Sequence, residues 1–94
     1  MHTLREQSLV VAAKDQVSCD LAGEAAILGL RDGVYYGLDL VGARVWNLIQ
    51  EPTTFAALRD TLLGEYDVEA SNLESDLREL LEQLAKHGLV VVTT

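Results

Sequence analysis

Hydrophobic and polar residues follow two different periods along the chain, and the change falls at Asp39. Residues 17–21 and 34–39 show the two-residue alternation of strands that bury one face, whereas residues 25–30 are apolar throughout, as in a central strand. Between the last two of these segments, Arg31-Asp32-Gly33 is a turn signal, because Gly33 can adopt a positive φ at little steric cost. The pattern predicts a three-stranded antiparallel meander over residues 17–39, with residues 9–13 extending or leading into its first strand.

After Asp39 the apolar residues recur with a helical period. Asp39 is a good N-cap for a first helix, which Pro52 ends because the residue before a proline avoids the helical region. Thr53 or Thr54 is expected to cap a second helix that runs to about residue 66.

The third predicted helix is the clearest element. Ser71 and Glu74 fit a capping box at its start, and Gly88 is the expected positive-φ residue at its end. Its apolar stripe consists of Leu73, Leu77, Leu80, Leu81 and Leu84. Residues 89–92 are predicted to form a short apolar strand or an extended tail packed on the core.

The order β-β-β-α-α-α predicts an α+β fold in which the last two helices form a helix-turn-helix and the sheet serves as a wing. The 94 residues correspond to one small domain, residues 1–94, with residues 1–8 frayed. The single cysteine, Cys19, cannot form an internal disulfide. Neither a signal peptide nor an apolar run long enough to span a membrane is present in the sequence, so a cytoplasmic protein with no membrane partner is expected.

Candidate chemistry is scarce in this chain. The two histidines, His2 and His87, and Cys19 do not stand at ligand spacing, so neither a metal site nor a cofactor site is predicted. The acidic pairs, such as Glu79 with Glu82, are more typical of a solvated helix face than of a catalytic pocket. No catalytic residues are predicted, and the chain is expected not to be an enzyme.

Two classes of binding protein remain from the residues alone. The open strand edge expected at residues 34–38, beside a leucine-rich helix, favours a module that binds an extended peptide. The alternative is an acidic winged-helix regulator that binds DNA or another protein. A net charge of −8 repels phosphate, and the expected recognition helix carries acidic residues, so no nucleic-acid partner is expected.

Several motifs together resemble a known family. They are Gly33-Val34-Tyr35-Tyr36-Gly37-Leu38-Asp39, then Gly42-Ala43-Arg44-Val45-Trp46-Asn47-Leu48-Ile49, and finally Gly88-Leu89-Val90. This combination resembles the PqqD-like family of RiPP recognition elements, which bind precursors of ribosomally made, modified peptides. The resemblance covers about residues 9–92. Asp39 stands where many relatives carry Asn, and both residues cap helices.

The resemblance implies a non-catalytic protein that binds the leader segment of a precursor peptide. The leader would add as a strand to the third strand, in a groove walled by the third helix. The implied leader-binding residues are Val34, Tyr35, Tyr36, Gly37, Leu38, Leu73, Asp76, Leu77 and Leu80. A free-standing acidic member is most similar to the recognition protein of lasso-peptide biosynthesis. Its implied partners are a separate cysteine leader peptidase, to which it delivers the leader, and a ring-closing cyclase.

The residues agree physically with this interpretation. The third strand is the last of the meander, so one of its edges is expected to remain unpaired, and Gly37 would let a foreign backbone approach closely. The sequence leaves open whether Leu73, Leu77 and Leu80 belong to the core or to the groove.

Overall fold

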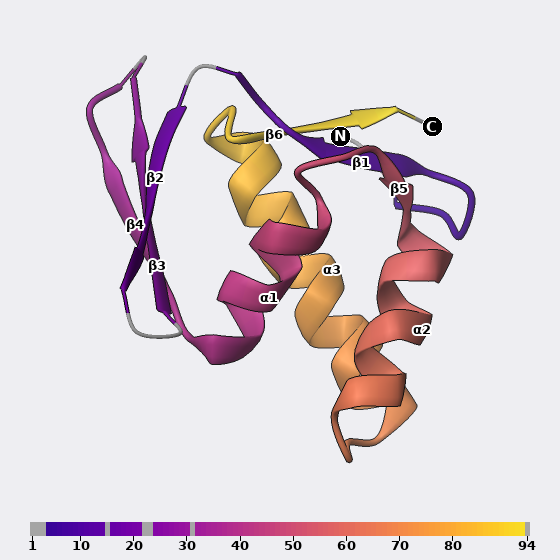
Figure 1. Ribbon diagram of the computed structural model, residues 1–94. Helices are drawn as coiled ribbons and strands as arrows, with labels where there is room; N and C mark the ends of the chain where they lie inside the picture. The colour runs from indigo at the N-terminus through magenta and orange to yellow at the C-terminus, as the bar shows by residue number, and fades with distance from the viewer. Residues whose placement is uncertain (1–3, 15, 22–23, 31, 94) are drawn as a thin grey trace.

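The computed structural model describes residues 4–14, 16–21, 24–30 and 32–93 (Figure 1). Its elements are β1 (Leu9–Ala12), β2 (Gln16–Leu21), β3 (Glu24–Gly29), β4 (Tyr35–Leu38), α1 (Leu40–Leu48), β5 (Thr53–Thr54), α2 (Phe55–Glu65), α3 (Ala70–Lys86) and β6 (Val90–Thr93). The strands form two separate sheets, and in Figure 1 the three helices lie to the right of β2, β3 and β4 and below β1, β5 and β6. The predicted α+β fold, a three-stranded sheet followed by three helices, is confirmed.

The first sheet, here named the meander sheet, has the order β2-β3-β4 with antiparallel neighbours, as predicted. Ala25, Ile27 and Leu38 are buried on its inner face, against which α1 packs. Gly33 adopts a φ of 70° in the turn between β3 and β4. Alternation of apolar residues and turn chemistry therefore suffice to define this part of the fold.

The second sheet, here named the terminal sheet, has the order β5-β1-β6. The sequence placed residues 9–13 with the first strand of the meander, but β1 pairs instead with β5 and with the C-terminal strand β6. Of the two possibilities for residues 89–92, a strand or a tail, the structure has a strand. These pairings join segments far apart in the sequence, which local periodicity does not reveal.

Residues 1–8 were expected to be frayed. Residues 1–3 lie outside the described residues, but residues 4–8 are packed against the domain. Leu4 is only 4% exposed and Ser8 is buried. The backbone N–H of Phe55 donates to the carbonyl of Ser8 at 2.9 Å, and that of Ala56 donates to Glu6 at 3.0 Å. The segment is therefore tied to the start of α2, and the expectation of fraying is wrong for it.

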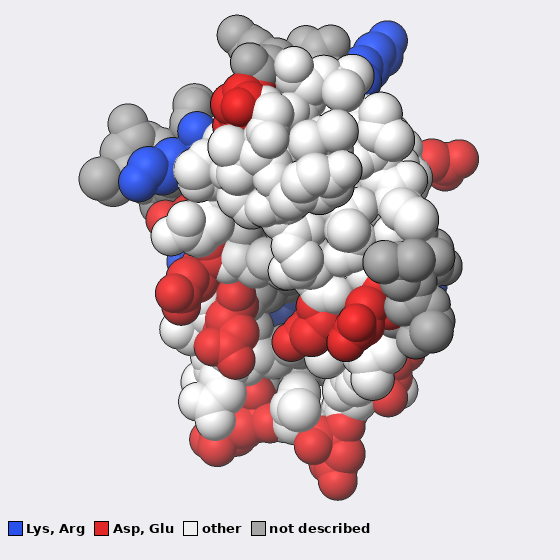
Figure 2. Space-filling view, turned by 90° about the vertical axis from the view of Figure 1, so that its left-hand side faces the viewer, with Lys and Arg blue, Asp and Glu red and all other residues white. Residues whose placement is uncertain are grey.

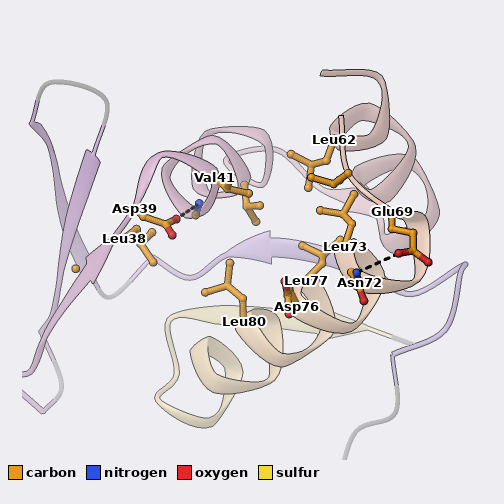
Figure 3. A pocket seen from close by; sticks show the side chains of 14 residues that line it. Leu38, Asp39, Val41, Leu62, Glu69, Asn72, Leu73, Asp76, Leu77 and Leu80 are labelled. Carbon is orange, nitrogen blue, oxygen red and sulfur yellow. Dashed lines mark hydrogen bonds between the residues drawn. The ribbon is translucent and has the colours of Figure 1, made fainter. Parts of the chain in front are cut away.

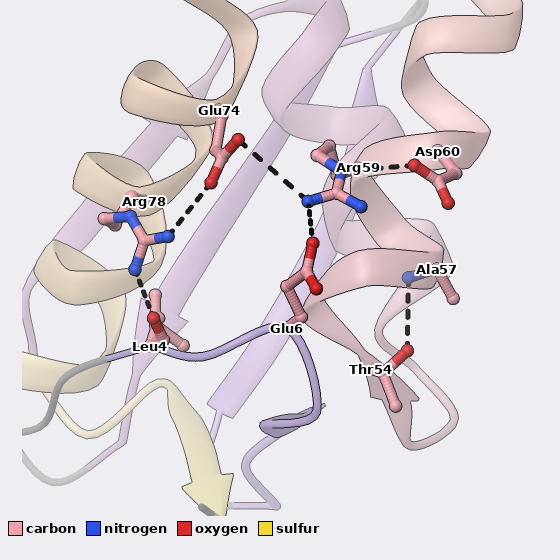
Figure 4. A network of polar contacts seen from close by, with 8 residues as sticks. All are labelled: Leu4, Glu6, Thr54, Ala57, Arg59, Asp60, Glu74 and Arg78. Carbon is pink, nitrogen blue, oxygen red and sulfur yellow. Dashed lines mark hydrogen bonds and ion pairs between the residues drawn. The ribbon is translucent and has the colours of Figure 1, made fainter. Parts of the chain in front are cut away.

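Two arginines hold the same segment from the helices (Figure 4). Arg59 of α2 pairs with the Glu6 carboxylate at 2.8 Å. Arg78 of α3 donates to the carbonyl of Leu4 and places its guanidinium 4.8 Å from the centre of the Phe55 ring. A guanidinium over an aromatic face is attracted by the ring quadrupole, so Arg78 links both helices to the N-terminal segment.

Two of the three predicted helix starts are confirmed. Asp39 caps α1, accepting the Gly42 N–H at 2.8 Å, and Thr54 caps α2, accepting the Ala57 N–H at 3.1 Å. Both bonds satisfy donors that a helix leaves without an internal partner.

The capping box predicted for the third helix is wrong. Helix α3 begins at Ala70, its N-cap is Glu69, and Ser71 lies within the first turn. The Glu74 carboxylate faces Arg78 at 3.2 Å and Arg59 at 4.0 Å (Figure 4). Ser71 therefore does not stand at the N-cap, and the Glu74 carboxylate makes ionic contacts on two helices rather than a reciprocal cap.

No helix among the described residues is long and apolar enough to cross a membrane.

The packing of the N-terminal segment predicts a cost for truncating Leu4. We expect Leu4→Ala to lower the free energy of unfolding by about 2–4 kcal/mol, because a buried leucine loses its contacts and leaves a cavity. Leu40, which is 62% exposed, is the matched control, and Leu40→Ala should change stability by less than about 0.5 kcal/mol. Urea unfolding of the two variants checks this. Equal effects would mean that Leu4 is not part of the core in solution.

Candidate peptide-binding groove

The edge of β4 that points away from β3 is unpaired among the described residues. The chain's own C-terminal strand does not occupy it, because β6 pairs with β1 in the terminal sheet. An unpaired strand edge presents a row of backbone donors and acceptors.

The pairing of β3 with β4 determines which backbone groups face that edge. The N–H of Gly29 donates to the carbonyl of Val34 at 3.0 Å, and the register places Leu28 opposite Tyr35. In an antiparallel pair, hydrogen-bonded and non-hydrogen-bonded positions alternate. Tyr36 and Leu38 therefore bond to β3, whereas Tyr35 and Gly37 direct their N–H and C=O groups toward the open edge.

A groove of about 710 Å³ begins at the C-terminal end of this strand (Figure 3). It lies between β4, the first turns of α1, and α3, with one side chain from α2. The lining residues are Gly37, Leu38, Asp39, Val41, Gly42, Val45, Leu62, Val68, Glu69, Asn72, Leu73, Asp76, Leu77 and Leu80. Most of them are apolar, and the labelled leucines and Val41 from the different elements point toward one another in Figure 3.

The three leucines of α3 that the sequence left undecided all line the groove. Leu73 and Leu77 are also buried in the core, so they form its floor. Leu80 is only partly buried and packs beside that core. Leu80 is therefore the α3 leucine best placed to gain buried area from a ligand.

Acidic side chains give the groove a negative rim. Asp39, Glu69 and Asp76 line it, and neither lysine nor arginine is among its lining residues. Asn72 donates to the Glu69 carboxylate at 3.4 Å, and Asp39 is already engaged in capping α1. A ligand that places an apolar side chain in the groove and a cation at its rim would match this distribution.

Six of the nine residues implied by the resemblance line the groove: Gly37, Leu38, Leu73, Asp76, Leu77 and Leu80. The other three do not. Val34 precedes β4, and its N–H donates to the Asp32 side chain at 3.0 Å. The Tyr35 side chain is 72% exposed. Tyr36 packs against His87 with the two rings tilted by 47° and 4.8 Å between their centres. Burial, followed by the charge of Asp32, raises the pKa of the Tyr36 hydroxyl.

Several lining residues were not predicted from the sequence, notably Val41 and Val45 of α1 and Leu62 of α2. Their helical spacing indicates only a core-facing stripe. Gly42 was also missed as a groove residue, and it lets α1 approach β4 closely: a Cβ added there would lie 3.2 Å from the Leu38 Cβ. The signal was present in the Gly-Ala pair at the start of the helix, which permits close packing.

An ion pair links α1 to α2, and both helices contribute residues to the groove. The guanidinium of Arg44 in α1 makes two hydrogen bonds with the Glu65 carboxylate of α2, at 2.9 and 2.7 Å. This bidentate contact lowers the pKa of Glu65. Both side chains are partly exposed, so the pair contributes little to stability but favours one spacing of the helices.

Catalytic and metal chemistry find no support in this groove. No cluster of three or more histidine, cysteine or acidic side chains that could hold a metal occurs in the described part of the chain. The lining supplies apolar contacts, a few carboxylates and, at its mouth, an open strand edge. This arrangement can bind an extended peptide.

The fold and the groove together define a winged helix-turn-helix domain with a strand edge open for β-augmentation. Residues 24–90 match the family model described as Coenzyme PQQ synthesis protein D (PqqD), and the chain belongs to this family. The resemblance noted in the sequence is thus confirmed. Members of the family are non-catalytic binding proteins, which agrees with the expectation that this chain is not an enzyme.

Two solved structures are similar to this chain. One is described as "TbiB1 in Complex with the TbiA(beta) Leader Peptide" and is 35% identical, with a TM-score of 0.79, covering 85% of this chain and 93% of that one. The other, "Lasso peptide synthetase B1 complexed with the leader peptide", is 21% identical, with a TM-score of 0.75, covering 87% and 96%. The second likeness shows the fold alone. A search of curated proteins found no match.

The Arg44–Glu65 pair predicts a pH-dependent effect on stability. Because the folded state lowers the pKa of Glu65, the pair stabilises the protein above the ordinary pKa of a glutamate and is lost as the pH falls through the lowered value. We expect Glu65→Gln to melt slightly below the parent at about pH 7, and the gap to narrow as the pH is lowered toward about 3. Thermal melts at both pH values test this. A gap that persists at low pH would show that the charge of Glu65 is not its cause.

Proposed function

We propose that this protein recognises the leader segment of a ribosomal precursor peptide by strand addition. The leader pairs antiparallel with β4 and places apolar side chains in the groove against α3. The protein then delivers the leader to a separate cysteine peptidase in lasso-peptide maturation, with a ring-closing cyclase acting on the released core peptide.

The observation that carries this proposal is the position of the open β4 edge at the mouth of the groove. The backbone groups of Tyr35 and Gly37 face the edge, and the groove continues from Gly37 between α1 and α3. Backbone pairing provides affinity for any extended peptide, whereas pockets for alternate side chains provide specificity. This chain has both elements in one continuous surface.

The expected free energy of leader binding is sufficient for a protein that holds a leader and delivers it. Tyr35 and Gly37 offer four backbone groups, each worth about 0.5–1.5 kcal/mol net when bonded. One or two apolar anchors in the groove add about 1.5–3 kcal/mol each. After the costs of association and of ordering the peptide, dissociation constants from low micromolar to nanomolar are expected.

The acidic rim of the groove favours a leader with cationic side chains. Asp76 lines the groove on α3, and Glu79 is exposed one turn further along the same helix. Cationic leader side chains at this end would be attracted over a few ångströms, and the attraction would weaken with salt.

The similar proteins support the same assignment. TbiB1, which shares 35% of its residues with this chain, is described in complex with a leader peptide. Delivery to a peptidase, and the participation of a cyclase, rest on the resemblance to the lasso-peptide recognition proteins.

Strand addition predicts a period-two response to N-methylation of the leader. The probes are the TbiA(beta) leader peptide and the leader of any short precursor that sequencing finds encoded beside this protein. N-methylation at alternate residues opposite β4 should reduce affinity at least about tenfold, because the methyl removes a donor and blocks the approach. Methylation of the intervening residues should have little effect. Fluorescence polarisation measures each affinity without altering the protein.

A flat N-methylation profile with tight binding would contradict strand addition while retaining leader recognition. Absence of saturable binding by either unmodified leader would overturn the proposed function itself.

A second prediction concerns the groove. Leu80→Ala should weaken leader binding about tenfold, because an apolar anchor loses its contact surface. Leu63 of α2 is the matched control, since it is also partly buried beside the core but does not line the groove. Leu63→Ala should leave the affinity within about twofold of the parent. Titration of both variants, after melts confirm folding, makes the comparison. Equal losses would place the leader elsewhere.

A further inference from the structure

The C-terminal end of α3 contacts the meander sheet through two aromatic rings. His87, the residue that ends α3, packs against Tyr36 of β4, with 4.8 Å between the ring centres. Tyr36 belongs to the strand whose open edge faces the groove, and α3 provides the groove floor. The contact therefore joins the two elements that an added peptide strand would have to touch together.

The backbone of His87 is fixed by the turn that ends α3. Gly88 has a φ of 74°, and its N–H donates to the carbonyl of Ala85 at 3.0 Å. The N–H of Leu89 donates to the carbonyl of Leu84 at 2.9 Å. These two bonds form a Schellman motif, which satisfies carbonyls that a helix leaves without an internal partner. His87 thus stands at a defined position relative to the groove residues of α3.

The same turn lies close to the end of β3. A Cβ added to Gly29, the last residue of β3, would lie 3.3 Å from the Cδ2 of Leu89, which is buried. The carbonyl of Leu89 also accepts the N–H of Ala13, the residue after β1, at 2.9 Å. The turn after α3 is therefore fastened on both sides, and it supports the meander sheet at β3 as well as at β4.

The outer face of the meander sheet offers no comparable support. Val17 is 55% exposed and Tyr35 is 72% exposed on this face. Figure 2, which looks onto the sheet, shows a broad uncharged surface there, with acidic side chains gathered below it. Within the described part of the chain, the position of the sheet thus depends on contacts with its inner face, from α1 and from the turn after α3.

Leader binding is sensitive to the position of β4. The strand edge offers the backbone groups of Tyr35 and Gly37, whereas Leu80 of α3 contacts an apolar anchor in the groove. One extended peptide can make both contacts at full strength only if the strand and the helix are held at the right separation. A separation that is fixed before binding also reduces the cost of ordering the complex.

We propose that His87 is a positioning residue for leader binding. Through Tyr36 it holds β4 at the separation from α3 that lets a leader pair with the strand edge and fill the groove at the same time. The inference rests on the proposed function, because it takes the leader to bind β4 and α3 together. It requires no contact between His87 and the leader.

A ring at position 87 should be sufficient for this role. His87→Ala should weaken binding of the TbiA(beta) leader peptide about fivefold, because the contact with Tyr36 is lost. His87→Phe keeps a ring and should bind within about twofold of the parent. Lys86→Ala is the matched control and should also stay within about twofold, because the exposed Lys86 lines a separate cavity of about 380 Å³ beside β6. Fluorescence polarisation measures each affinity after melts confirm folding.

A double-mutant cycle separates positioning from direct contact with the leader. His87 and Leu80 are seven residues apart, about 10 Å along the helix axis, so independent contacts would give additive losses. With Leu80→Ala costing about tenfold alone, independent losses would weaken the double variant about fiftyfold. Positioning predicts about fifteenfold, because a leader no longer held against both elements loses less when the groove contact is removed.

The outcomes separate this inference from the proposed function. Additive losses in the cycle, or a His87→Phe variant as weak as His87→Ala, would overturn the positioning role and leave leader recognition intact. A loss in Lys86→Ala equal to that in His87→Ala would do the same. No saturable binding of either leader by the unaltered protein would overturn the proposed function, and this inference with it.

Discussion

The pairing of β6 with β1 is the interaction on which the open site depends. The C-terminal strand is apolar and could satisfy its backbone at any available sheet edge. Because β1 lies between β5 and β6, the terminal sheet takes up this strand, and the edge of β4 remains unpaired among the described residues. Burial of Val10 and Val90 favours this pairing over the alternative, since both side chains reach the common core.

A close contact between α1 and β4 gives the groove its shape. Gly42 has no side chain to separate the first turn of α1 from Leu38, and Asp39 fixes the start of that turn by capping it. The helix therefore begins directly beside the strand edge. On the far side, the Arg44–Glu65 pair links α1 to α2, which supplies Leu62 to the same groove. The site is thus a consequence of how α1 is anchored at its start by Asp39 and at its middle by Arg44, and the floor of the groove is part of the core.

The sequence predicted those features that depend on neighbouring residues. The meander and the caps at Asp39 and Thr54 follow from alternation and turn chemistry, whereas the groove residues on β4 and α3 were implied by the family resemblance. The terminal sheet did not follow, because its partners are more than forty residues apart and no local pattern joins them. The capping box failed because α3 begins at Ala70 with Glu69 as its N-cap, so Ser71 does not stand at the cap position. Likewise, Leu4 is buried by contacts that a short polar N-terminus does not reveal.

Strand β4 contributes to the core, to the open edge and to the outer face of the meander sheet. It can do so because the directions of its backbone groups and of its side chains both alternate from one residue to the next. At Tyr36 and Leu38 the backbone bonds to β3 and the side chains turn inward, so these residues build the domain. At Tyr35 and Gly37 the backbone faces the open edge, and the exposed Tyr35 side chain lies on the outer face of the meander sheet. A shift of β4 by one residue would exchange these roles, burying Tyr35 and exposing Leu38. The turn at Gly33, with its φ of 70°, and the Asp39 cap bound the strand at its two ends and oppose such a shift. The register of this four-residue strand therefore determines which residues bind and which residues fold.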